Sequence, residues 1–235
     1  MTFGLLALIT VAGLAGPLLA ALPRLGLPLV VGEIGVGVLL GRTGLGWIDA
    51  GEPTTAFLSE VGFAMLMFVV GTHLPLRHPG LRSALATVAG TSILIAGFTA
   101  GAVLAAVGEP RRLAQQLVGV AEGFLVPLFF VTLGARLEFG ALLGSGKALL
   151  LLAGLVVAAT TLHVLVAIVL RRPVAVGLLA TAALGVPSAV VSIGLAQGVL
   201  DAGQAAAVVS AVLATIAVSA AGGSHLSRYA GKAPR

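Results

Sequence analysis

Apolar residues occur in long runs along this chain, and polar residues interrupt them only briefly. Because the hydrocarbon core of a bilayer is about 30 Å thick, one crossing helix needs roughly 20 apolar residues. Helices are expected, since backbone groups in lipid must pair within their own segment. The first run has no basic segment before it, so we expect a retained helix rather than a cleaved signal peptide. The predicted spans are residues 2–22, 29–48, 54–72, 83–107, 113–134, 148–170, 173–199 and 203–222.

Composition supports an all-α membrane protein. The 235 residues are 59% hydrophobic and 9% charged, and the mean hydropathy is +1.16. A soluble domain carries about 25% charged residues, so we expect the chain to lie in a lipid bilayer. We assign the net charge of +5 to short loops, where basic residues set helix orientation. We expect no nucleic-acid partner, because no basic stripe is interleaved with aromatic residues.

Two residue types limit the chemistry. There is no cysteine, which excludes disulfides, thiolate metal sites and cysteine nucleophiles. The four histidines have no helical pairing, so they predict no metal site. We find no nucleophile–base pair and no phosphate loop, so we expect no enzyme activity, no catalytic residue and no cofactor.

Glycine is abundant, and several glycines are four residues apart within one predicted span. Such pairs allow helix backbones to approach closely. The alternative is that glycine is simply common in membrane helices. The pairs are Gly37/Gly41, Gly97/Gly101 and Gly119/Gly123.

Three glutamates fall within predicted spans, where an ionisable group costs at least about 2.5–3.5 kcal/mol. Glu33 and Glu60 lie near their helix starts. We interpret them as structural or interfacial acids, because a carboxylate there favours the positive end of the helix dipole. Glu122 is a transport candidate, although it is interfacial if its span begins near Phe124.

His163 is the most specific single candidate. It lies about sixteen residues into a span that has no other charge between Ala148 and Leu170. Histidine changes charge near physiological pH, so this side chain could carry a transported proton. The alternative is a hydrogen-bonded packing residue.

The seventh predicted span contains a helix-breaking signal. Gly185 and Pro187 interrupt a 27-residue apolar run, and Ser188 and Ser192 follow them. Proline removes a donor and clashes one turn back, so the helix should kink or unwind near Gly185. Freed carbonyls at such a break can bind a cation. The alternative is an ordinary proline kink that the serines repair.

Three stretches together resemble the cation:proton antiporter superfamily, most closely its bacterial Na⁺/H⁺ and K⁺/H⁺ exchanger branch. They are LPLVVGEIGVGVLLGRTGLG (27–46), FLSEVGFAMLMFVVGTHLPLR (57–77) and GFLVPLFFVTLGARLEFGAL (123–142). By this resemblance Glu33 and Glu60 match common family glutamates. His163 falls where electrogenic members carry a membrane lysine. The ALGVPSAVV segment resembles one of two broken helices that cross near the ion site.

The resemblance also shows what is missing. Such antiporters have about thirteen helices and bind cation or proton with one or two core aspartates. Here the aspartates are Asp49 and Asp201, both in predicted loops. About five helices are missing, and we place the loss between Val107 and Arg111. We therefore predict segments 1–107 and 113–222 around a short join at 108–112, with a basic tail at 223–235.

The arginines make the orientation of the two segments a problem. In the family orientation most basic loop residues lie inside, Arg112 among them, while Arg42 and Arg136 lie outside. The excess on the inside agrees with the positive-inside rule in each segment. However, an odd number of missing helices would require the join to recross the membrane, and five residues cannot span about 30 Å. As a plain eight-span protein, the chain instead has Arg42 and Arg112 on one side, Arg136 on the other, and one half inverted.

The sequence therefore predicts a partial antiporter fold of about eight transmembrane helices with one broken helix retained, in the cell inner membrane. By resemblance it exchanges Na⁺ or K⁺ for H⁺, with His163, Glu122 and the backbone from Gly185 through Pro187 to Ser188 as transport candidates. The partners are monovalent cations, protons and the lipid bilayer, and a homodimer is left open. The alternative is a non-transporting membrane subunit or a degraded antiporter remnant.

Overall fold

The computed structural model describes residues 10, 11, 13, 29–73, 93–107, 111–182 and 185–230. This part of the chain is all-helical. The predicted helix at 2–22 lies almost entirely outside the described residues. Two compact units divide the chain, Met1–Arg136 and Leu137–Arg235. Their boundary does not coincide with the predicted join at 108–112, and each unit is described by itself.

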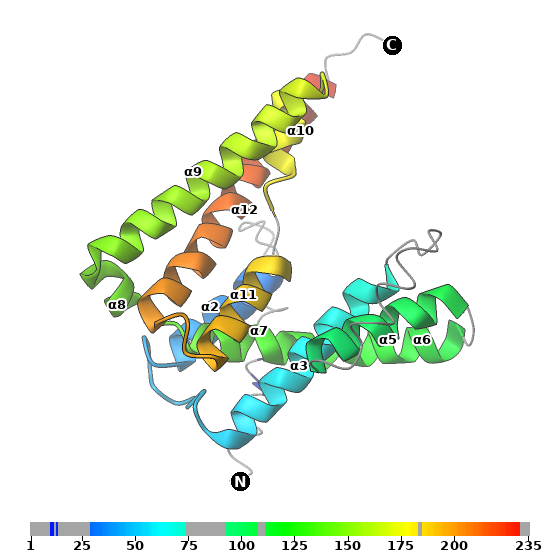
Figure 1. Ribbon diagram of the computed structural model, residues 1–235, viewed down its shortest axis with the longest axis vertical. Helices are drawn as coiled ribbons and strands as arrows, with labels where there is room; N and C mark the ends of the chain where they lie inside the picture. The colour runs from blue at the N-terminus through cyan, green and yellow to red at the C-terminus, as the bar shows by residue number, and fades with distance from the viewer. Residues whose placement is uncertain are drawn as a thin grey trace. The chain divides into compact units, whose positions relative to one another are not determined.

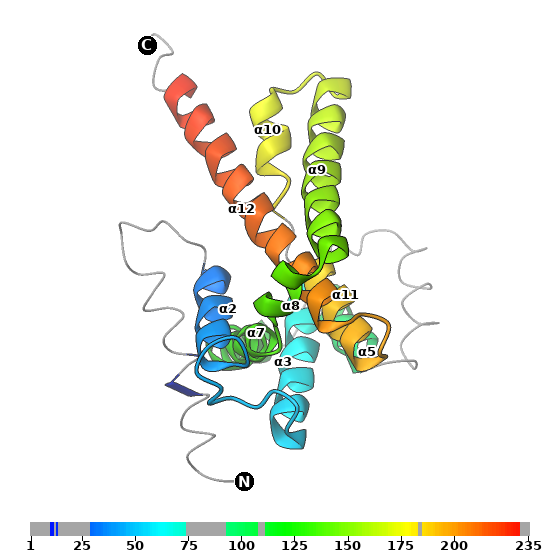
Figure 2. The ribbon, with the colours of Figure 1, turned by 90° about the vertical axis from the view of Figure 1, so that its left-hand side faces the viewer.

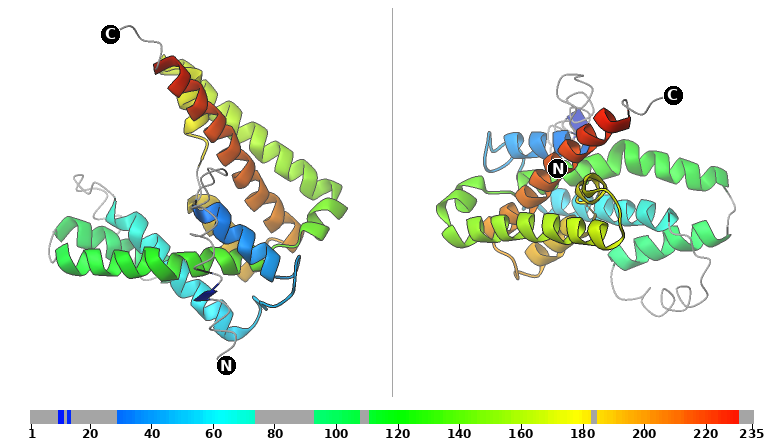
Figure 3. Two further views of the ribbon diagram at one scale, coloured as in Figure 1. Left: turned by 180° about the vertical axis from the view of Figure 1, so that it is seen from behind. Right: turned by 90° about the horizontal axis from the view of Figure 1, so that it is seen from above.

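The helices of the first unit follow the predicted spans closely except for the early end of α2 and a π-helical turn before α7. α6, η1 and α7 form one continuous rod with a π-helical turn in the middle (Figure 3). α5 is the described part of the span predicted at 83–107. The elements labelled in Figure 1 are α2 (Leu29–Leu40), α3 (Pro53–Thr72), α5 (Ile93–Val107), α6 (Arg111–Val120) and α7 (Val126–Ala135). Between α6 and α7 lies the π-helical turn η1 (Ala121–Leu125).

α2 is shorter than the sequence predicts, because the span at 29–48 ends in turns after Leu40. The backbone N–H of Leu45 donates to the carbonyl of Leu39 at 2.7 Å, and that of Gly46 donates to the carbonyl of Gly41 at 2.9 Å, so the chain folds back on the last turn of α2. Gly46 then adopts a φ of +67°, which a residue with a side chain rarely tolerates. The glycines that read as part of an apolar run therefore terminate the helix.

α3 begins where its sequence places a cap. The Glu52 carboxylate accepts a hydrogen bond from the Thr55 backbone N–H at 3.0 Å, and Pro53 occupies the first helical position. Proline suits this position because its missing N–H would have no partner in the first turn. These local signals explain why the prediction of 54–72 is correct to within one residue.

α2 and α7 pack backbone against backbone and run in the same direction. A methyl group at Gly37 would collide with the backbone of Val131, and one at Gly41 with that of Ala135. The residue numbers of the contacting positions rise together along both helices, so the two helices are parallel. The close approach predicted from this glycine pair is confirmed.

A second glycine pair joins α3 to α5 in the same way. A methyl group at Gly97 would collide with the backbone of Ala64, and one at Gly101 with that of Phe68. These helices are therefore parallel too, although they are consecutive among the described helices of this unit. By contrast, Gly119 and Gly123 face open space, so the third predicted pair makes no close contact.

α3 and α7 run in opposite directions and share an aromatic core. The rings of Phe63 and Phe129 stack with their centroids 4.9 Å apart, and Phe130 meets Phe129 edge to face at 5.0 Å. Near the start of α3, Thr132 Oγ1 lies 2.9 Å from Ser59 Oγ. This core fixes α7 between α2 and α3.

The second unit is built on two long helices that lie side by side with α10 (Figure 2). The span predicted at 173–199 is divided into α10 and α11, as the glycine and proline indicated. α12 continues to Ala230, into the predicted basic tail. The elements are α8 (Phe139–Gly144), α9 (Gly146–Val169), α10 (Val174–Leu179), α11 (Gly185–Ala196) and α12 (Ala202–Ala230).

Among the described residues, four helices are long and apolar enough to cross a membrane by length and composition: Pro53–Thr72, Ala114–Ala135, Gly146–Val169 and Ala202–Ala220. Shorter apolar helices cover Leu29–Leu40, Ile95–Val107 and Val186–Ala196. The prediction of about eight complete spans is therefore supported only in part.

Candidate functional site

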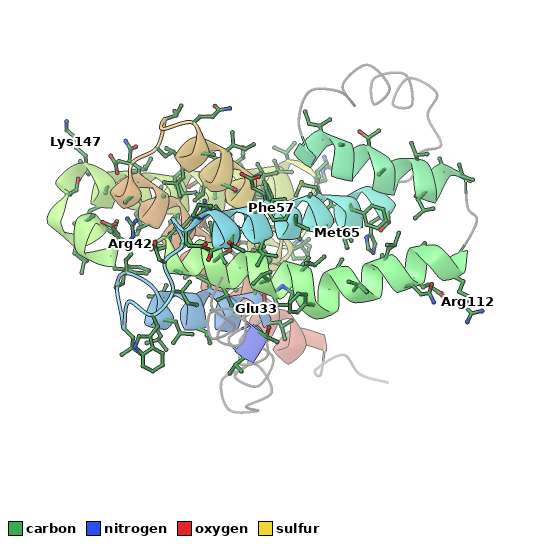
Figure 4. All side chains as sticks on the ribbon, turned by 90° about the horizontal axis from the view of Figure 1, so that it is seen from below. Glu33, Arg42, Phe57, Met65, Arg112 and Lys147 are labelled. Carbon is green, nitrogen blue, oxygen red and sulfur yellow. The ribbon has the colours of Figure 1, made fainter. Side chains whose placement is uncertain are left out.

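The arginines of the first unit settle the relative direction of its helices. The backbone N–H of Arg42 donates to the carbonyl oxygen of Ala135 at 3.3 Å, so Arg42 and Arg136 lie at the same end of the unit. Arg112 lies at the opposite end, as Figure 4 shows. The plain eight-span counting assumed that successive spans alternate in direction, and so placed Arg42 with Arg112 and opposite Arg136; the helix ends of this unit are arranged differently.

The return that this arrangement requires falls between α3 and α5. Since these helices are parallel, the 20 residues at 73–92 connect opposite ends of the pair. A 20-residue helix is about 30 Å long, and 20 extended residues reach about 66 Å. The chain therefore has room for the return here, which the five residues at 108–112 lack.

Glu60 is exposed on α3, and its negative charge influences the pKa of Arg136. Burial lowers the pKa of Arg136 below its ordinary value, while the charge of Glu60 raises it and that of Arg42 lowers it again. Arg136 is the residue that follows the last turn of α7. Glu60 thus balances positive charge at this end of the unit.

Glu122 occupies the π-helical turn between α6 and α7, and its side chain is exposed. The Val126 backbone N–H donates to the Ala121 carbonyl, five residues back, and Pro127 has no N–H to continue the α-helical pattern. Such turns occur frequently at functional sites. The membrane-compatible segment begins at Ala114, so Glu122 lies within it rather than before it.

Glu33, which the sequence indicated as a structural or interfacial acid, is buried. Its side chain is only 1% exposed. Neither carboxylate oxygen has a hydrogen-bond partner among the described residues. Burying a polar group without a partner is unfavourable, so this position needs a physical reason beyond a helix cap.

His163 bonds to its own helix in the second unit. Its Nδ1 lies 2.8 Å from the Ala159 carbonyl oxygen, one turn earlier on α9. Because a carbonyl oxygen only accepts, Nδ1 carries the hydrogen in this contact. α10 approaches the same turn, since a methyl group at Gly177 would lie 2.7 Å from the His163 carbonyl oxygen.

The break between α10 and α11 has a different form from a kinked helix. α10 ends at Leu179, and α11 begins at Gly185. Pro187 is the third residue of α11, in the first helical turn where its missing N–H disturbs nothing. Ser188 is buried in that same turn. The proline therefore starts a second helix instead of bending one.

Side-chain hydroxyl groups donate hydrogen bonds to the carbonyl oxygens at the end of α10. Thr181 Oγ1 lies 2.7 Å from the Leu178 carbonyl oxygen, and Ser219 Oγ of α12 donates to the Leu179 carbonyl oxygen at 2.9 Å. Thr181 Oγ1 also lies 3.1 Å from the Thr215 carbonyl oxygen. Sequence reasoning named Ser188 and Ser192 for this repair and missed Thr181 and Ser219. Their signal was hydroxyl groups on otherwise apolar helices.

The two aspartates cap turns. Asp201 Oδ1 accepts from the Gln204 backbone N–H at 2.7 Å, and the Gln204 side chain accepts in return from the Asp201 N–H at 3.0 Å. This reciprocal pair is a capping box that starts α12. Asp49 accepts from the Gly51 N–H at 2.9 Å in the loop after α2. Both aspartates thus lie in loops, as predicted.

These features define an all-helical membrane protein with glycine-packed parallel helices and one broken helix. The family described as "Sodium/hydrogen exchanger, transmembrane" matches residues 6–84 and 79–228. The chain belongs to this family, which confirms the resemblance to cation:proton antiporters. The two matched stretches meet at 79–84, and the second continues through 108–112.

Two bacterial relatives cover parts of the chain. The Na(+)/H(+) antiporter of Enterococcus hirae is 44% identical over 68 residues, 29% of this chain and 17% of the relative. The Na(+)/H(+)-K(+) antiporter GerN of Bacillus cereus is 40% identical over 85 residues, 34% of this chain and 22% of the relative. The matched parts are thus less than a quarter of either relative's length. No solved structure gave a significant match.

Proposed function

We propose that the chain exchanges Na⁺ or K⁺ for H⁺ across the cell inner membrane as a shortened member of its family. The observation that carries the proposal is the family match, which extends over residues 6–228. The relatives are named as antiporters of Na⁺, K⁺ and H⁺. A bilayer is the natural solvent for helices such as Gly146–Val169, whose surface within the unit is mainly exposed and apolar.

The family's loss of helices in this chain falls within residues 73–92 on this proposal. Two observations support that position. α3 and α5 are parallel, and the two matched stretches meet at 79–84. The first unit would then combine both family segments with each in its family orientation, Arg42 and Arg136 on the outside and Arg112 on the inside.

His163 is the proposed proton-titrating group of the second unit, through Nε2. The proposed polar backbone of this unit is the segment from Gly185 through Pro187 to Ser188. The carbonyls of Leu178 and Leu179, which precede the break, already accept hydroxyl hydrogen bonds. The proposed polar site therefore lies on the α11 side of the break. Glu122, in the π-helical turn of the first unit, is the proposed acid there.

The test uses the purified full chain in liposomes that contain a pH-sensitive dye. An outward or inward NaCl or KCl gradient is expected to drive a change in internal pH, and His163→Ala is expected to abolish it. His73→Ala is the matched control, because the Nδ1 of His73 lies 2.8 Å from the Val69 carbonyl, the same one-turn contact. An absence of flux from pure, correctly inserted protein contradicts the proposed exchange.

A non-transporting subunit is the second candidate, and the two aspartates favour it. Asp49 and Asp201 both hold loops in place, so neither is free to serve as a core cation ligand. On this alternative the chain packs against partner helices, or is a remnant of a longer antiporter. Native gels and crosslinking separate the cases: a discrete hetero-complex without flux favours the subunit, and a homodimer with flux favours the exchanger.

A further inference from the structure

Glu33 is the buried ionisable side chain of the first unit to which the proposed function gives no role. Its carboxyl group is 1% exposed, and both oxygens are without a hydrogen-bond partner among the described residues. The other acids of the described unit differ in kind. Glu60 and Glu122 are exposed, and Glu52 caps α3.

The packing of α2 explains why Glu33 is buried. Glu33, Gly37 and Gly41 follow one another every four residues and so share one face of the helix. Gly37 and Gly41 touch the backbone of α7, so Glu33 lies one turn earlier on the face that packs against α7. From the other side, a methyl group at Gly134 would collide with the Ile34 carbonyl. The glycine contacts hold the carboxyl group between the helices.

Among the described residues of the unit, no positive charge lies on the segment that packs against Glu33. The segment of α7 that packs against α2, Val126–Ala135, has no ionisable residue. The described arginines of the unit, Arg42, Arg111, Arg112 and Arg136, lie at helix ends, and Figure 4 labels Arg42 and Arg112 with Glu33 between them. The nearest acid in the rod is Glu122, whose charge has the same sign as that of a carboxylate.

A buried carboxylate without a charged partner is unfavourable. Binding one H⁺ or one monovalent cation makes the group neutral in either case. We propose that Glu33 is a further ion-binding carboxyl group of the first unit, which binds a proton and a monovalent cation in turn. The inference rests on the proposed function, in which His163 and Glu122 keep their roles.

The binding part of the proposal is tested by carbodiimide labelling of the full chain in liposomes. Dicyclohexylcarbodiimide adds to a protonated carboxyl group in an apolar environment and leaves a stable N-acylurea, which peptide mass spectrometry locates. Labelling of Glu33 is expected to increase as the pH falls. It should decrease when NaCl or KCl replaces choline chloride at the same ionic strength, because a bound cation displaces the proton.

Two variants separate chemistry from folding. Glu33→Gln removes the titrating group and is expected to reduce exchange at least about 100-fold, the lower end of what a positioned proton-transfer group contributes. Glu33→Asp keeps a carboxyl group, so cation-sensitive labelling should persist if Gln fails to insert. Glu60→Gln is the matched control, because Glu60 is an exposed acid on a neighbouring helix. It should retain exchange.

The outcomes distinguish this inference from the proposed function. Cation-sensitive labelling of Glu33 without flux in the unsubstituted chain supports the binding site and contradicts the exchange activity. An unlabelled Glu33 at acid pH, or labelling that Na⁺ and K⁺ leave unchanged, overturns the site. Exchange in Glu33→Gln at the rate of the unsubstituted chain overturns it as well.

Discussion

The backbone N–H of Arg42 donates a hydrogen bond to the carbonyl oxygen of Ala135 at 3.3 Å, so the C-terminal ends of α2 and α7 meet. Residues 93 positions apart thus mark one end of the first unit. This contact shows that the unit is built from helices whose order in the chain does not alternate in direction. The predictions below test the contacts on which that arrangement and the broken helix depend.

Side-specific labelling tests the directions of the helices. In a chain without cysteine, Trp47→Cys and Arg136→Cys are expected to react with an impermeant maleimide from one side of the membrane. Arg112→Cys should react from the other side, because Arg112 begins the rod that ends at Arg136. The unsubstituted chain is the blank. Reaction of positions 47 and 112 from the same side contradicts the arrangement.

The glycine contact between α2 and α7 predicts opposite effects at two neighbouring glycines. Gly37→Ala forces a methyl group into the Val131 backbone and should lower the free energy of unfolding by about 1–3 kcal/mol. Gly35→Ala places its methyl group in open space and should raise it by about 0.5–1 kcal/mol, because alanine favours helix. Unfolding in detergent measures both. Equal effects would show that the contact is not formed.

The Glu52 cap predicts a stability difference that depends on pH. Hydrogen bonds from the Thr55 backbone N–H and the Thr54 hydroxyl hold the pKa of Glu52 below its ordinary value of 4.5. The folded state therefore favours the charged form. The cap stabilises α3 fully above pH 4.5, and its contribution disappears as the pH falls through the lowered folded-state pKa.

Melting temperatures of the unsubstituted chain and Glu52→Ala, measured across this range, check the sign. The unsubstituted chain should melt at the higher temperature above pH 4.5, and the two curves should converge in more acidic solution. A difference that grows as the pH falls contradicts the cap.

The end of α10 predicts unequal effects of two serines on α12. Ser219→Ala removes the hydroxyl that donates to the Leu179 carbonyl at 2.9 Å, and the loss should reduce stability by about 1–3 kcal/mol. Ser210→Ala is the matched control, because the buried Ser210 hydroxyl has no partner among the described residues. It should have little effect. Thermal unfolding of the two variants in the same detergent makes the comparison, and a loss at Ser210 as large as at Ser219 speaks against the role.

Local signals made several helices predictable. α3 and α9 agree with the sequence because an uninterrupted apolar run follows a capping residue, Glu52 or Ser145. The break in the seventh span was predictable from Gly185 and Pro187, since proline is disfavoured in the interior of a helix. α2 was predicted too long because its terminating turn, around Gly44 and Gly46, contains few polar residues.

Features that depend on distant residues were not predictable. The parallel directions of α3 and α5 follow from contacts such as Gly97 with Ala64, which no local pattern encodes. The burial of Glu33 likewise depends on how closely Gly37 approaches α7. The identity of the buried hydroxyl partners, Thr181 and Ser219, also required the structure.

Two helices that touch backbone to backbone at two positions four residues apart cannot slide along each other, because a shift drives one main chain into the other. Each of the two pairs, α2 with α7 and α3 with α5, is therefore expected to move as one rigid body. If this protein alternately opens to the two sides of the membrane, the moving bodies are such pairs. A single helix piston is incompatible with these contacts.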